Sequence, residues 1–499
     1  MKKISKIIFI ALLTIVMGCN DAIDIRQPGR LDAINAFQSV DDLELGLLGL
    51  YNQWDLTPEI SLASNFCDEI SIGFDSGGQG LALYGFVQTP ATASGADFWV
   101  RNFRVNNRAS ILIEAAANID PDASELAQYN QILAEAYFIR AYANLEMLTY
   151  FSTDPRNDSA LAVPVIESVP ALTIQPDRST TGELWDYINS DIAEAQGLMN
   201  SQSGVTRLSV DAINAFRARA ANLRGDYSTA ASLAQQLLTA YPIANQVNYQ
   251  LMFLDASNSE IIFKLERTLN DFYDGQVNTG SVGTGGGWAG SIYAFVSATL
   301  AGSPYFEMDR KLYNMLDATP GDVRYDVNVA PTSVINPDYA TDPDPVNTDI
   351  IVIQKYQGSE GQPLMNDLKV FRSSEMLFIL AEARAAQNDL PGAAALIKQL
   401  RDARTGSAQP LPVYGSQAEA FGDILDEKRI EFCFEGHRFR DLKRLGVAAN
   451  RGIDRDVTDC TQQGDACTLP ASDYRFTLPI PIVEINANPG IASQQNPGY

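Results

Sequence analysis

The sequence predicts a mostly α-helical protein built from antiparallel helical hairpins with long irregular insertions between them. Two observations predict this fold. The segments 219–237 and 382–400 align with each other, and each holds an alanine-rich helix, a Gly-Asp or Asn-Asp turn and a second helix. The second helix places Ala and Leu at i, i+3 and i+7, and small residues at this spacing let two helices pack closely.

The two aligned segments resemble the tetratricopeptide repeat, and a degenerate relative of them covers 134–143. Apolar periodicity also predicts amphipathic helices elsewhere in the chain. These helices are expected near 39–54, 98–118, 181–199 and 424–445.

Three insertions are expected to interrupt this scaffold, near 66–97, 152–179 and 271–350. The region 152–179 contains four prolines and is predicted to be extended. The region 271–350 contains a glycine run and many aromatic residues. Long loops in a compact protein are usually functional or disordered, and disordered segments are poor in aromatic residues. The insertions are therefore predicted to bind a ligand.

The amino terminus has the features of a bacterial lipoprotein signal peptide. Three lysines precede an apolar run over 7–17, which as a helix measures roughly 16 Å and is too short to cross a bilayer. Gly18 and Cys19 follow, and this junction resembles the lipobox. Residues 1–18 are thus expected to be removed and Cys19 to carry the lipid. The alternative is an ordinary signal peptide that ends near a cysteine.

Composition excludes several classes of function. The net charge is −25, or −28 once the three signal-peptide lysines are removed, which argues against nucleic-acid binding. One histidine and no Cys-x-x-Cys motif argue against a metal site, and no cofactor is expected. The four aspartates between 338 and 349 lack the spacing of a calcium loop. Cys460 and Cys467 bracket a polar stretch and are predicted to form a disulfide.

Four motifs together are similar to the SusD/RagB family of surface nutrient-binding lipoproteins. The strongest covers 424–446, and the others cover 98–107, 371–383 and 476–485. The resemblance implies that 19–499 form a single SusD-like domain, an α superhelix anchored by its lipid outside the outer membrane. It also implies a partner, a SusC-like TonB-dependent β-barrel transporter that receives glycans or peptides.

The 424–446 motif is expected to be one helix. On a helix, Glu435–Arg438 and Arg438–Asp441 are i,i+3 pairs. A structural connection between the carboxyl-terminal segment and the repeats is favoured over a binding patch. His437 and Cys433 are expected to pack in the core.

A sugar is bound by flat aromatic rings beside side chains that form hydrogen bonds with hydroxyls. Within the insertions, Trp288 is the best candidate platform because it follows the glycine run. The alternative is that each aromatic residue closes a small loop core, and Trp99 is assigned to the core. The other predicted ligand contacts are Tyr273, Phe74, Tyr84, Asp68, Asp75 and Asp274.

The predicted function is binding of a neutral glycan without catalysis. Glycoside hydrolases need two carboxylates at a set separation, but no motif marks such a pair and no nucleophile or phosphate motif is present. Three alternatives remain: oligopeptide import, glycoside hydrolysis, and a tetratricopeptide scaffold that recognises a protein helix. Micromolar or weaker affinity is expected, about −8 kcal/mol at best.

Overall fold

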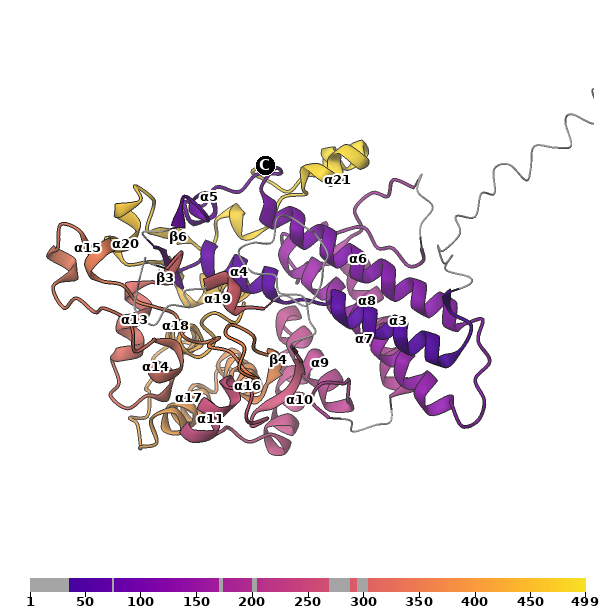
Figure 1. Ribbon diagram of the computed structural model, residues 1–499, viewed down its shortest axis with the longest axis horizontal. Helices are drawn as coiled ribbons and strands as arrows, with labels where there is room; N and C mark the ends of the chain where they lie inside the picture. Colours follow the sequence, from indigo (N-terminus) through magenta and orange to yellow (C-terminus); the bar gives the residue numbers. More distant parts are fainter. Residues whose placement is uncertain (1–35, 74–75, 170–173, 200–203, 269–287, 294–303) are drawn as a thin grey trace, which may run out of the picture.

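The computed structural model describes residues 36–73, 76–169, 174–199, 204–268, 288–293 and 304–499 (Figure 1). Helices dominate, so the mostly α prediction is confirmed. The helices of the first half are α3 (Val40–Gln53), α4 (Thr57–Phe66), α5 (Leu81–Tyr84), α6 (Ala93–Ala116), α7 (Leu126–Phe151), α8 (Thr181–Leu198), α9 (Val210–Arg224), α10 (Tyr227–Ala240) and α11 (Gln246–Phe253).

The second half contains shorter helices and most of the strands. Its helices are α12 (Gly290–Tyr293), α13 (Arg310–Asp317), α14 (Val323–Asn328), α15 (Pro345–Thr348), α16 (Ser373–Ala386), α17 (Leu390–Thr405), α18 (Gln417–Glu431), α19 (Arg438–Ala449), α20 (Val457–Gln462) and α21 (Ile482–Ala487), with 3-10 turns η2 (Tyr339–Thr341), η3 (Tyr474–Phe476) and η4 (Pro489–Gln494). The strands form three antiparallel pairs: β1 (Ile70–Ile72) with β3 (Phe306–Met308), β2 (Ile261–Leu265) with β4 (Leu368–Arg372), and β5 (Gly452–Asp454) with β6 (Thr468–Pro470).

The two predicted hairpins are present as α9–α10 and α16–α17, and α10 packs on α16. Both turns use the same local chemistry. Gly225 and Asn388 have positive φ values of 87° and 64°, which end the first helix of each pair. The next residue caps the second helix, because the Asp226 carboxylate accepts from the Thr229 N–H and the Asp389 carboxylate from the Gly392 N–H.

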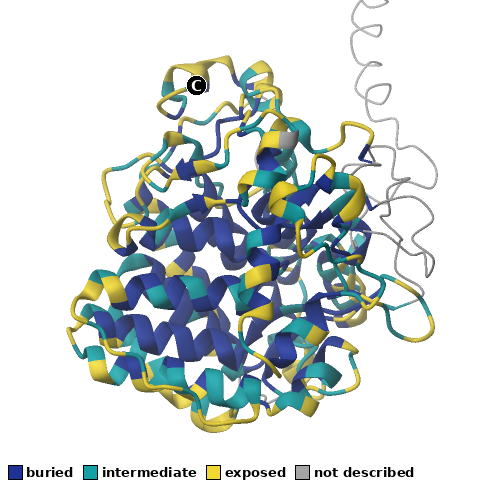
Figure 2. Ribbon diagram, turned by 90° about the vertical axis from the view of Figure 1, so that its left-hand side faces the viewer, coloured by how far each residue is buried: buried dark blue, intermediate teal, exposed yellow. Residues whose placement is uncertain are grey.

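A helical bundle lies beside the hairpins. The helices α3, α6, α7 and α8 pack together at one end of the molecule, and α13, α15 and α20 lie at the other end (Figure 1). Arg140 of α7 forms a bidentate ion pair with Asp191 of α8, at 2.9 and 2.6 Å. The buried sides of the helices face one another, whereas exposed residues follow the outer surfaces and loops (Figure 2).

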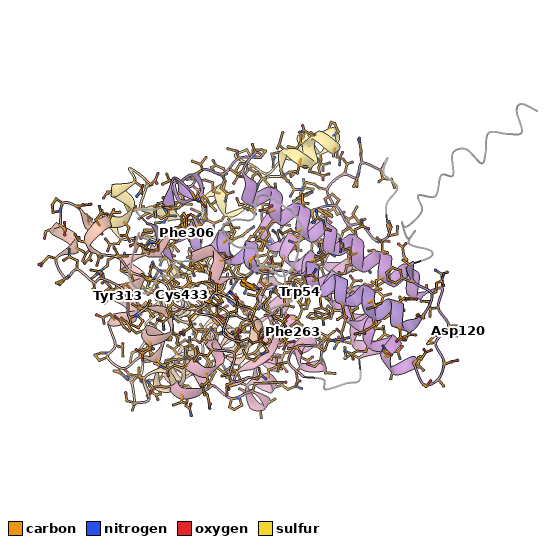
Figure 3. All side chains as sticks on the ribbon, viewed as in Figure 1. Trp54, Asp120, Phe263, Phe306, Tyr313 and Cys433 are labelled. Carbon is orange, nitrogen blue, oxygen red and sulfur yellow. A yellow bond between two sulfur atoms is a disulfide. The ribbon has the colours of Figure 1, made fainter. Side chains whose placement is uncertain are left out.

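Aromatic residues connect the bundle to the β2–β4 pair. Trp54, which follows α3, stacks on Phe263 of β2 with ring centroids 5.5 Å apart, and both residues lie near the centre of the molecule (Figure 3). Tyr142 of α7 packs on the same tryptophan at 4.8 Å. Offset aromatic pairs of this kind add about 0.5–1.5 kcal/mol beyond the area that they bury.

The prediction of one helix over 424–445 is wrong. The chain turns between α18 and α19, where Phe434 and Gly436 have φ values of 64° and 82°. Glycine also permits a close approach here, because a Cβ at Gly436 would lie 3.2 Å from the Cβ of Glu59 in α4. This break redirects the charged side chains that follow it.

The predicted i,i+3 pairs of this motif are therefore also wrong. Glu435 accepts two hydrogen bonds from Arg372 of β4 at 2.9 Å, and Arg438 pairs with Asp68 at 2.8 and 2.9 Å. Asp441 pairs with Lys428 at 2.8 Å. Glu435 is half-buried and the other five residues of these pairs are buried, so the motif connects distant segments, as its structural interpretation predicts.

The smaller predictions have clear outcomes. His437 is 6 % exposed and stacks on Phe432 with ring centroids 4.2 Å apart, and Cys433 is a buried free thiol. The predicted disulfide joins Cys460 to Cys467. Residues 152–169 and 174–179 contain no helix. None of the helices in the described ranges is long and apolar enough to span a bilayer.

Candidate ligand-binding site

Two of the predicted insertions meet in a short antiparallel sheet. Strand β1 follows α4 at the start of the 66–97 insertion, and β3 lies in the 271–350 insertion. Their register pairs Ile70 with Met308 and Ile72 with Phe306. Gly73 continues the contact, since its N–H donates to Tyr305 O at 3.0 Å and a Cβ at this position would overlap Pro304 O. Backbone pairing thus joins the two insertions to each other.

Buried carboxyl groups lie beneath this sheet. Although burial opposes its ionisation, Arg429 and Arg438 hold the pKa of Asp68 well below its ordinary value. Burial instead raises the pKa of Glu69 to about 7 and that of Glu307 to about 8. Hydrogen bonds from Ser64 and from the N–H groups of Phe434 and Ile351 offset this effect of burial only in part, so the protonated form of each is favoured up to near-neutral pH.

An uncharged pocket lies next to this sheet, and we call it the tyrosine pocket. Its volume is about 170 Å³. None of the described side chains that line it is charged, although 19 % of the residues of the chain are charged. It is lined by Gly290, Tyr293, Ala330, Thr332, Val352, Ile353, Gln354, Tyr356, Gln357, Pro363 and Leu364.

The two tyrosines of this pocket are held rigidly. Their rings are parallel within 4°, with centroids 6.4 Å apart. The hydroxyls of Tyr293 and Ser64 are 2.6 Å apart, and the Tyr356 hydroxyl donates to Phe434 O at 2.8 Å. Because both hydroxyls bond to the protein, the rings supply apolar surface to the pocket and the polar contacts come from other residues.

Amide and hydroxyl groups supply those polar contacts. Gln354 is half-buried and its side-chain N–H donates to Asp326 O at 3.2 Å. Gln357 is exposed, and Thr332 is half-buried. A carboxamide both donates and accepts, so it can bond to either face of a hydroxyl group. Apolar ring surface beside neutral amides is the chemistry that recognises a sugar.

Gly290 gives the pocket its shape. It is the first residue of α12, and a Cβ there would lie 2.7 Å from Leu364 O and 2.8 Å from Leu364 Cα. Only glycine lets the two backbones come this close. The contact fixes the α12 side of the pocket against the 363–364 side.

Two of the sequence-predicted contacts lie in the core instead. Tyr84 is 0 % exposed, and the Arg455 guanidinium covers its ring at 3.8 Å from the centroid. Asp68 is 0 % exposed and ion-paired, so it and Tyr84 present no surface to a ligand. Trp288 directly precedes α12 and is 5 % exposed, about as much as the pocket tyrosines Tyr293 and Tyr356, so its role as a platform stays a prediction. The corrections for Tyr84 and Asp68 have one cause: composition does not separate a ligand contact from a buried residue.

The remaining predicted contacts and the lipid-attachment residue are not part of the described structure. The residues Cys19, Phe74, Asp75, Tyr273 and Asp274 lie outside the described ranges. The pocket residues that the sequence prediction missed, Gln354, Tyr356 and Gln357, lie just beyond position 350, where the predicted insertion ends. The same argument from aromatic, amide and glycine residues, extended to position 364, would have included them.

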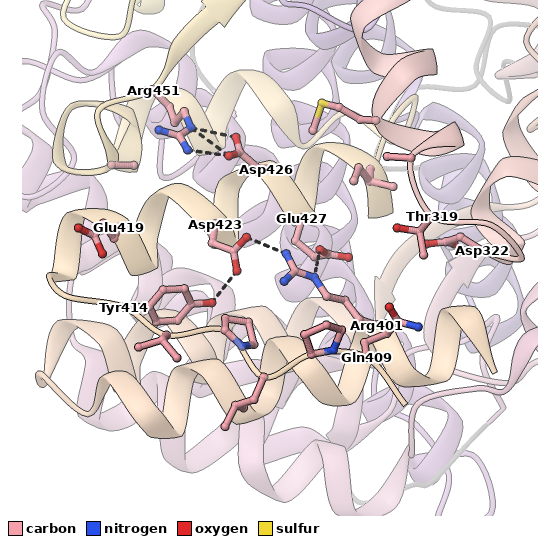
Figure 4. Close-up of a pocket in the computed structure, with 18 of the residues that line it drawn as sticks. Thr319, Asp322, Arg401, Gln409, Tyr414, Glu419, Asp423, Asp426, Glu427 and Arg451 are labelled. Carbon is pink, nitrogen blue, oxygen red and sulfur yellow. Dashed lines mark hydrogen bonds and ion pairs between the residues drawn. The ribbon is translucent and has the colours of Figure 1, made fainter. Parts of the chain in front are cut away.

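Two larger hollows have charged linings. One is a groove of about 960 Å³ between α17, α18 and the segment 409–416 (Figure 4). The other is a cleft of about 750 Å³ between α7 and α8, lined by Arg140 and five carboxylates. Neither adjoins the β1–β3 pair. The tyrosine pocket is therefore the candidate site for a neutral ligand.

Comparison with known proteins finds similar sequences, one of which aligns with nearly the whole chain. Residues 311–499 match the family model described as the SusD family, and residues 92–221 match a model described as "Starch-binding associating with outer membrane". SusD-like protein P2 of Formosa agariphila is 25 % identical over 529 residues, covering 99 % of each chain.

Solved structures share the fold. A SusD superfamily protein from Bacteroides thetaiotaomicron aligns with a TM-score of 0.75 and 23 % identity, over 92 % of this chain and all of that one. Surface glycan-binding protein A from Bacteroides fluxus aligns with a TM-score of 0.69 and 22 % identity, over 93 % of this chain and all of that one.

Proposed function

We propose that the chain is a member of the SusD family and binds a neutral extracellular oligosaccharide at the tyrosine pocket. The observation that carries this proposal is the uncharged lining of that pocket in a strongly acidic protein. The description of the matched model and the name of the Bacteroides fluxus protein support a carbohydrate ligand. A volume of about 170 Å³ accommodates one sugar ring, so the rest of the oligosaccharide would lie across the surface.

We further propose that the protein delivers its ligand to a TonB-dependent transporter. In this proposal, residues 19–499 form one domain and Cys19 carries a lipid that holds it on the outer membrane, facing outwards. Family membership supports this arrangement. Crosslinking in intact cells followed by affinity purification should recover a large outer-membrane barrel with the protein, and repeated recovery of the protein alone would contradict it.

We propose binding without hydrolysis. Glycosidases place two carboxyl groups roughly 5–9.5 Å apart around the scissile bond. The described residues that line the tyrosine pocket include no carboxylate and no histidine. Incubation of the protein with a bound oligosaccharide should return the oligosaccharide intact by mass spectrometry. Turnover that disappears when a single carboxylate is substituted would establish an enzyme instead.

The test of the pocket uses Gln357→Ala. Gln357 is exposed, so its truncation leaves the core unchanged. Loss of one hydrogen bond to a neutral hydroxyl is worth about 0.5–1.5 kcal/mol, or roughly a 2- to 10-fold weaker Kd. A neutral glycan array should identify the ligand, and calorimetry should show this loss. Gln196→Ala, at an exposed position of α8, is the matched control and should bind as the wild type does.

A further inference from the structure

The groove of Figure 4 has an unusual wall, the segment 409–416, which we call the arm. It connects α17 to α18. Pro410 and Pro412 alternate with Leu411 and Val413. Proline fixes its own φ near −65° and keeps the residue before it out of the helical region, so this part of the arm is extended.

The arm presents apolar side chains to solvent. Leu411 is 54 % exposed and Val413 is 91 % exposed. Isolated exposed residues of this type are ordinary, but here two lie at alternate positions of one extended segment that borders a groove of about 960 Å³. Alternate residues of an extended chain face the same side. The arm therefore offers a short apolar edge.

The backbone of the arm is held only near its ends. The Gln409 N–H donates to the Asp402 carboxylate at 2.6 Å, and the Gly415 N–H donates to Glu419 at 2.7 Å. Within the described structure, the N–H groups of Leu411 and Val413 have no protein hydrogen-bond partner. An extended segment with free N–H groups on one side can accept a further strand.

Charge selects which strand would bind. The groove is lined by five carboxylates and three guanidinium groups. Arg401 pairs with Asp423 at 2.7 Å and with Glu427 at 2.6 Å, and Arg451 pairs with Asp426 at 2.7 Å.

The third guanidinium, Arg324, pairs with Asp322 at 2.6 Å. Every guanidinium of the groove is thus neutralised, and carboxylates remain in excess. Glu419, which is exposed, forms no ion pair within the described structure. The groove therefore attracts a cation rather than an anion.

We propose that this groove is a docking site for an extended segment of a partner protein. The segment would pair its backbone with the arm and place aliphatic side chains on Leu411 and Val413. A lysine or arginine of the same segment would lie beside Glu419. Peptides bind the edges of sheets in this way, and there the main chain supplies affinity and alternate side chains supply specificity. This inference does not depend on the proposed glycan site.

The groove fits a peptide better than a sugar. Its ring surface comes from Tyr414, whose hydroxyl donates to Asp423 at 2.6 Å, and most of its charged groups bond to one another. A sugar would have to break these ion pairs to satisfy its hydroxyls. A cationic aliphatic strand needs only the free N–H groups, the apolar edge and the surplus carboxylate.

The experiment uses a fluorescent hexapeptide of alternating lysine and valine as the probe and measures anisotropy with the full mature chain. The wild type should bind it with a Kd of about 10–100 μM, since short strands in open grooves bind weakly. Leu411→Ser/Val413→Ser should weaken binding at least about tenfold, because two apolar contacts are lost and no charge is added. Val413→Pro keeps an apolar side chain but removes one N–H, and it should weaken binding several-fold.

The control is Leu45→Ser/Leu48→Ser, which changes two exposed leucines of α3 by the same chemistry. It should bind the probe as the wild type does, and a hexapeptide of alternating glutamate and valine should not bind. Equal binding by the arm and control variants would show general attraction to an acidic protein and overturn the proposal. Absence of any binding by the wild type would overturn it as well. Glycan affinity should be the same in all variants.

Discussion

Arg438 donates through Nε and Nη2 to the two carboxylate oxygens of Asp68, at 2.8 and 2.9 Å, across 370 residues of sequence. Both residues are buried, and Arg429 lies 3.5 Å from the same carboxylate. The pair joins the break between α18 and α19 to the segment that starts β1. Because β1 carries the first insertion, the carboxyl-terminal motif positions the surface around the tyrosine pocket.

Substitution of Asp68 by Asn should therefore destabilise the fold strongly. It leaves the buried Arg438 guanidinium without its carboxylate, whereas Arg429 keeps its pair with Asp309 at 3.0 Å, and breaking a buried pair from one side costs about 3–5 kcal/mol. Urea denaturation should show this decrease in the free energy of unfolding. Asp426→Asn breaks the exposed pair with Arg451 and should cost less than about 1 kcal/mol. Similar losses in the two variants would contradict the structural role of Asp68.

Stability should also depend on Glu307 as the pH rises. Burial raises the pKa of Glu307 to about 8, above its value in the unfolded chain. Between the two pKa values the folded state holds a proton that the unfolded state releases, so stability falls as the pH increases from about 4.5 to 8.

Glu307→Gln imitates the protonated carboxyl and should lose part of this dependence. The variant should be more stable than the wild type at pH 8, and the difference should shrink towards pH 5. Urea unfolding at pH 5 and pH 8 measures this difference in the free energy of unfolding. The control, Glu194→Gln on the exposed side of α8, should follow the wild type at both values. If Glu307→Gln is less stable than the wild type at pH 8, the carboxyl is ionised in the folded protein.

The hairpins were predictable because their determinants are local. The Gly225-Asp226 and Asn388-Asp389 turns each combine a left-handed residue with a helix cap, and both are visible in the sequence. The break at Phe434 was not predictable in the same way, because a non-glycine residue rarely has positive φ and only tertiary contacts hold it there.

The sequence predicted the insertions that contribute to the candidate site, but not most of the residues that line it. The sequence located the insertions, but it gave no means of seeing that Arg455 covers Tyr84 or that Arg438 occupies Asp68. Both contacts join residues more than 350 positions apart. Tyr356 was missed because the predicted insertion ended at position 350, before the residues that face Tyr293.

The disulfide should contribute to stability through α20. It closes a short loop between residues seven apart in sequence, which by loop-closure entropy is worth about 2–3 kcal/mol. The helix that it holds also contacts α13, because the Arg310 N–H donates to Asp459 at 2.8 Å. Reduction, or Cys460→Ser/Cys467→Ser, should lower the melting temperature by several degrees.

Thiol labelling shows whether the disulfide is reduced when the melting temperature is measured. Burial raises the pKa of Cys433 to about 12 and that of Cys67 well above its ordinary value, so neither thiol should react with iodoacetamide in the folded protein. Both should react after denaturation, and Cys460 and Cys467 should react only after reduction. An unchanged melting temperature in the reduced protein, with labelling at these two positions, would show that the disulfide is dispensable.

Gly290→Ala should damage the tyrosine pocket. The added Cβ would lie within 2.9 Å of the backbone and Cβ of Leu364, so α12 and the 363–364 segment must separate. Glycan affinity should fall at least about tenfold, because displaced contacts lose both packing and hydrogen bonds. Gly197→Ala is the control, since nothing lies within 4 Å of its Cβ position in α8. Binding by Gly290→Ala that equals the control would place the ligand elsewhere.

The uncharged lining of the pocket predicts binding that does not depend on salt. Interactions of charged ligands weaken as the Debye length shortens, whereas hydrogen bonds and apolar contacts with a neutral sugar change little. For a neutral oligosaccharide, the Kd should change less than about twofold between roughly 0.05 and 0.5 M sodium chloride. A uronate-rich glycan should not bind, because the protein is a polyanion and the described residues that line the pocket include no cation. Calorimetry with both glycans at the two salt concentrations measures these Kd values.

The lysine–valine hexapeptide serves as the contrast, because its binding at the acidic groove should weaken clearly with salt. A strong salt dependence for the neutral glycan would place it at one of the two charged hollows.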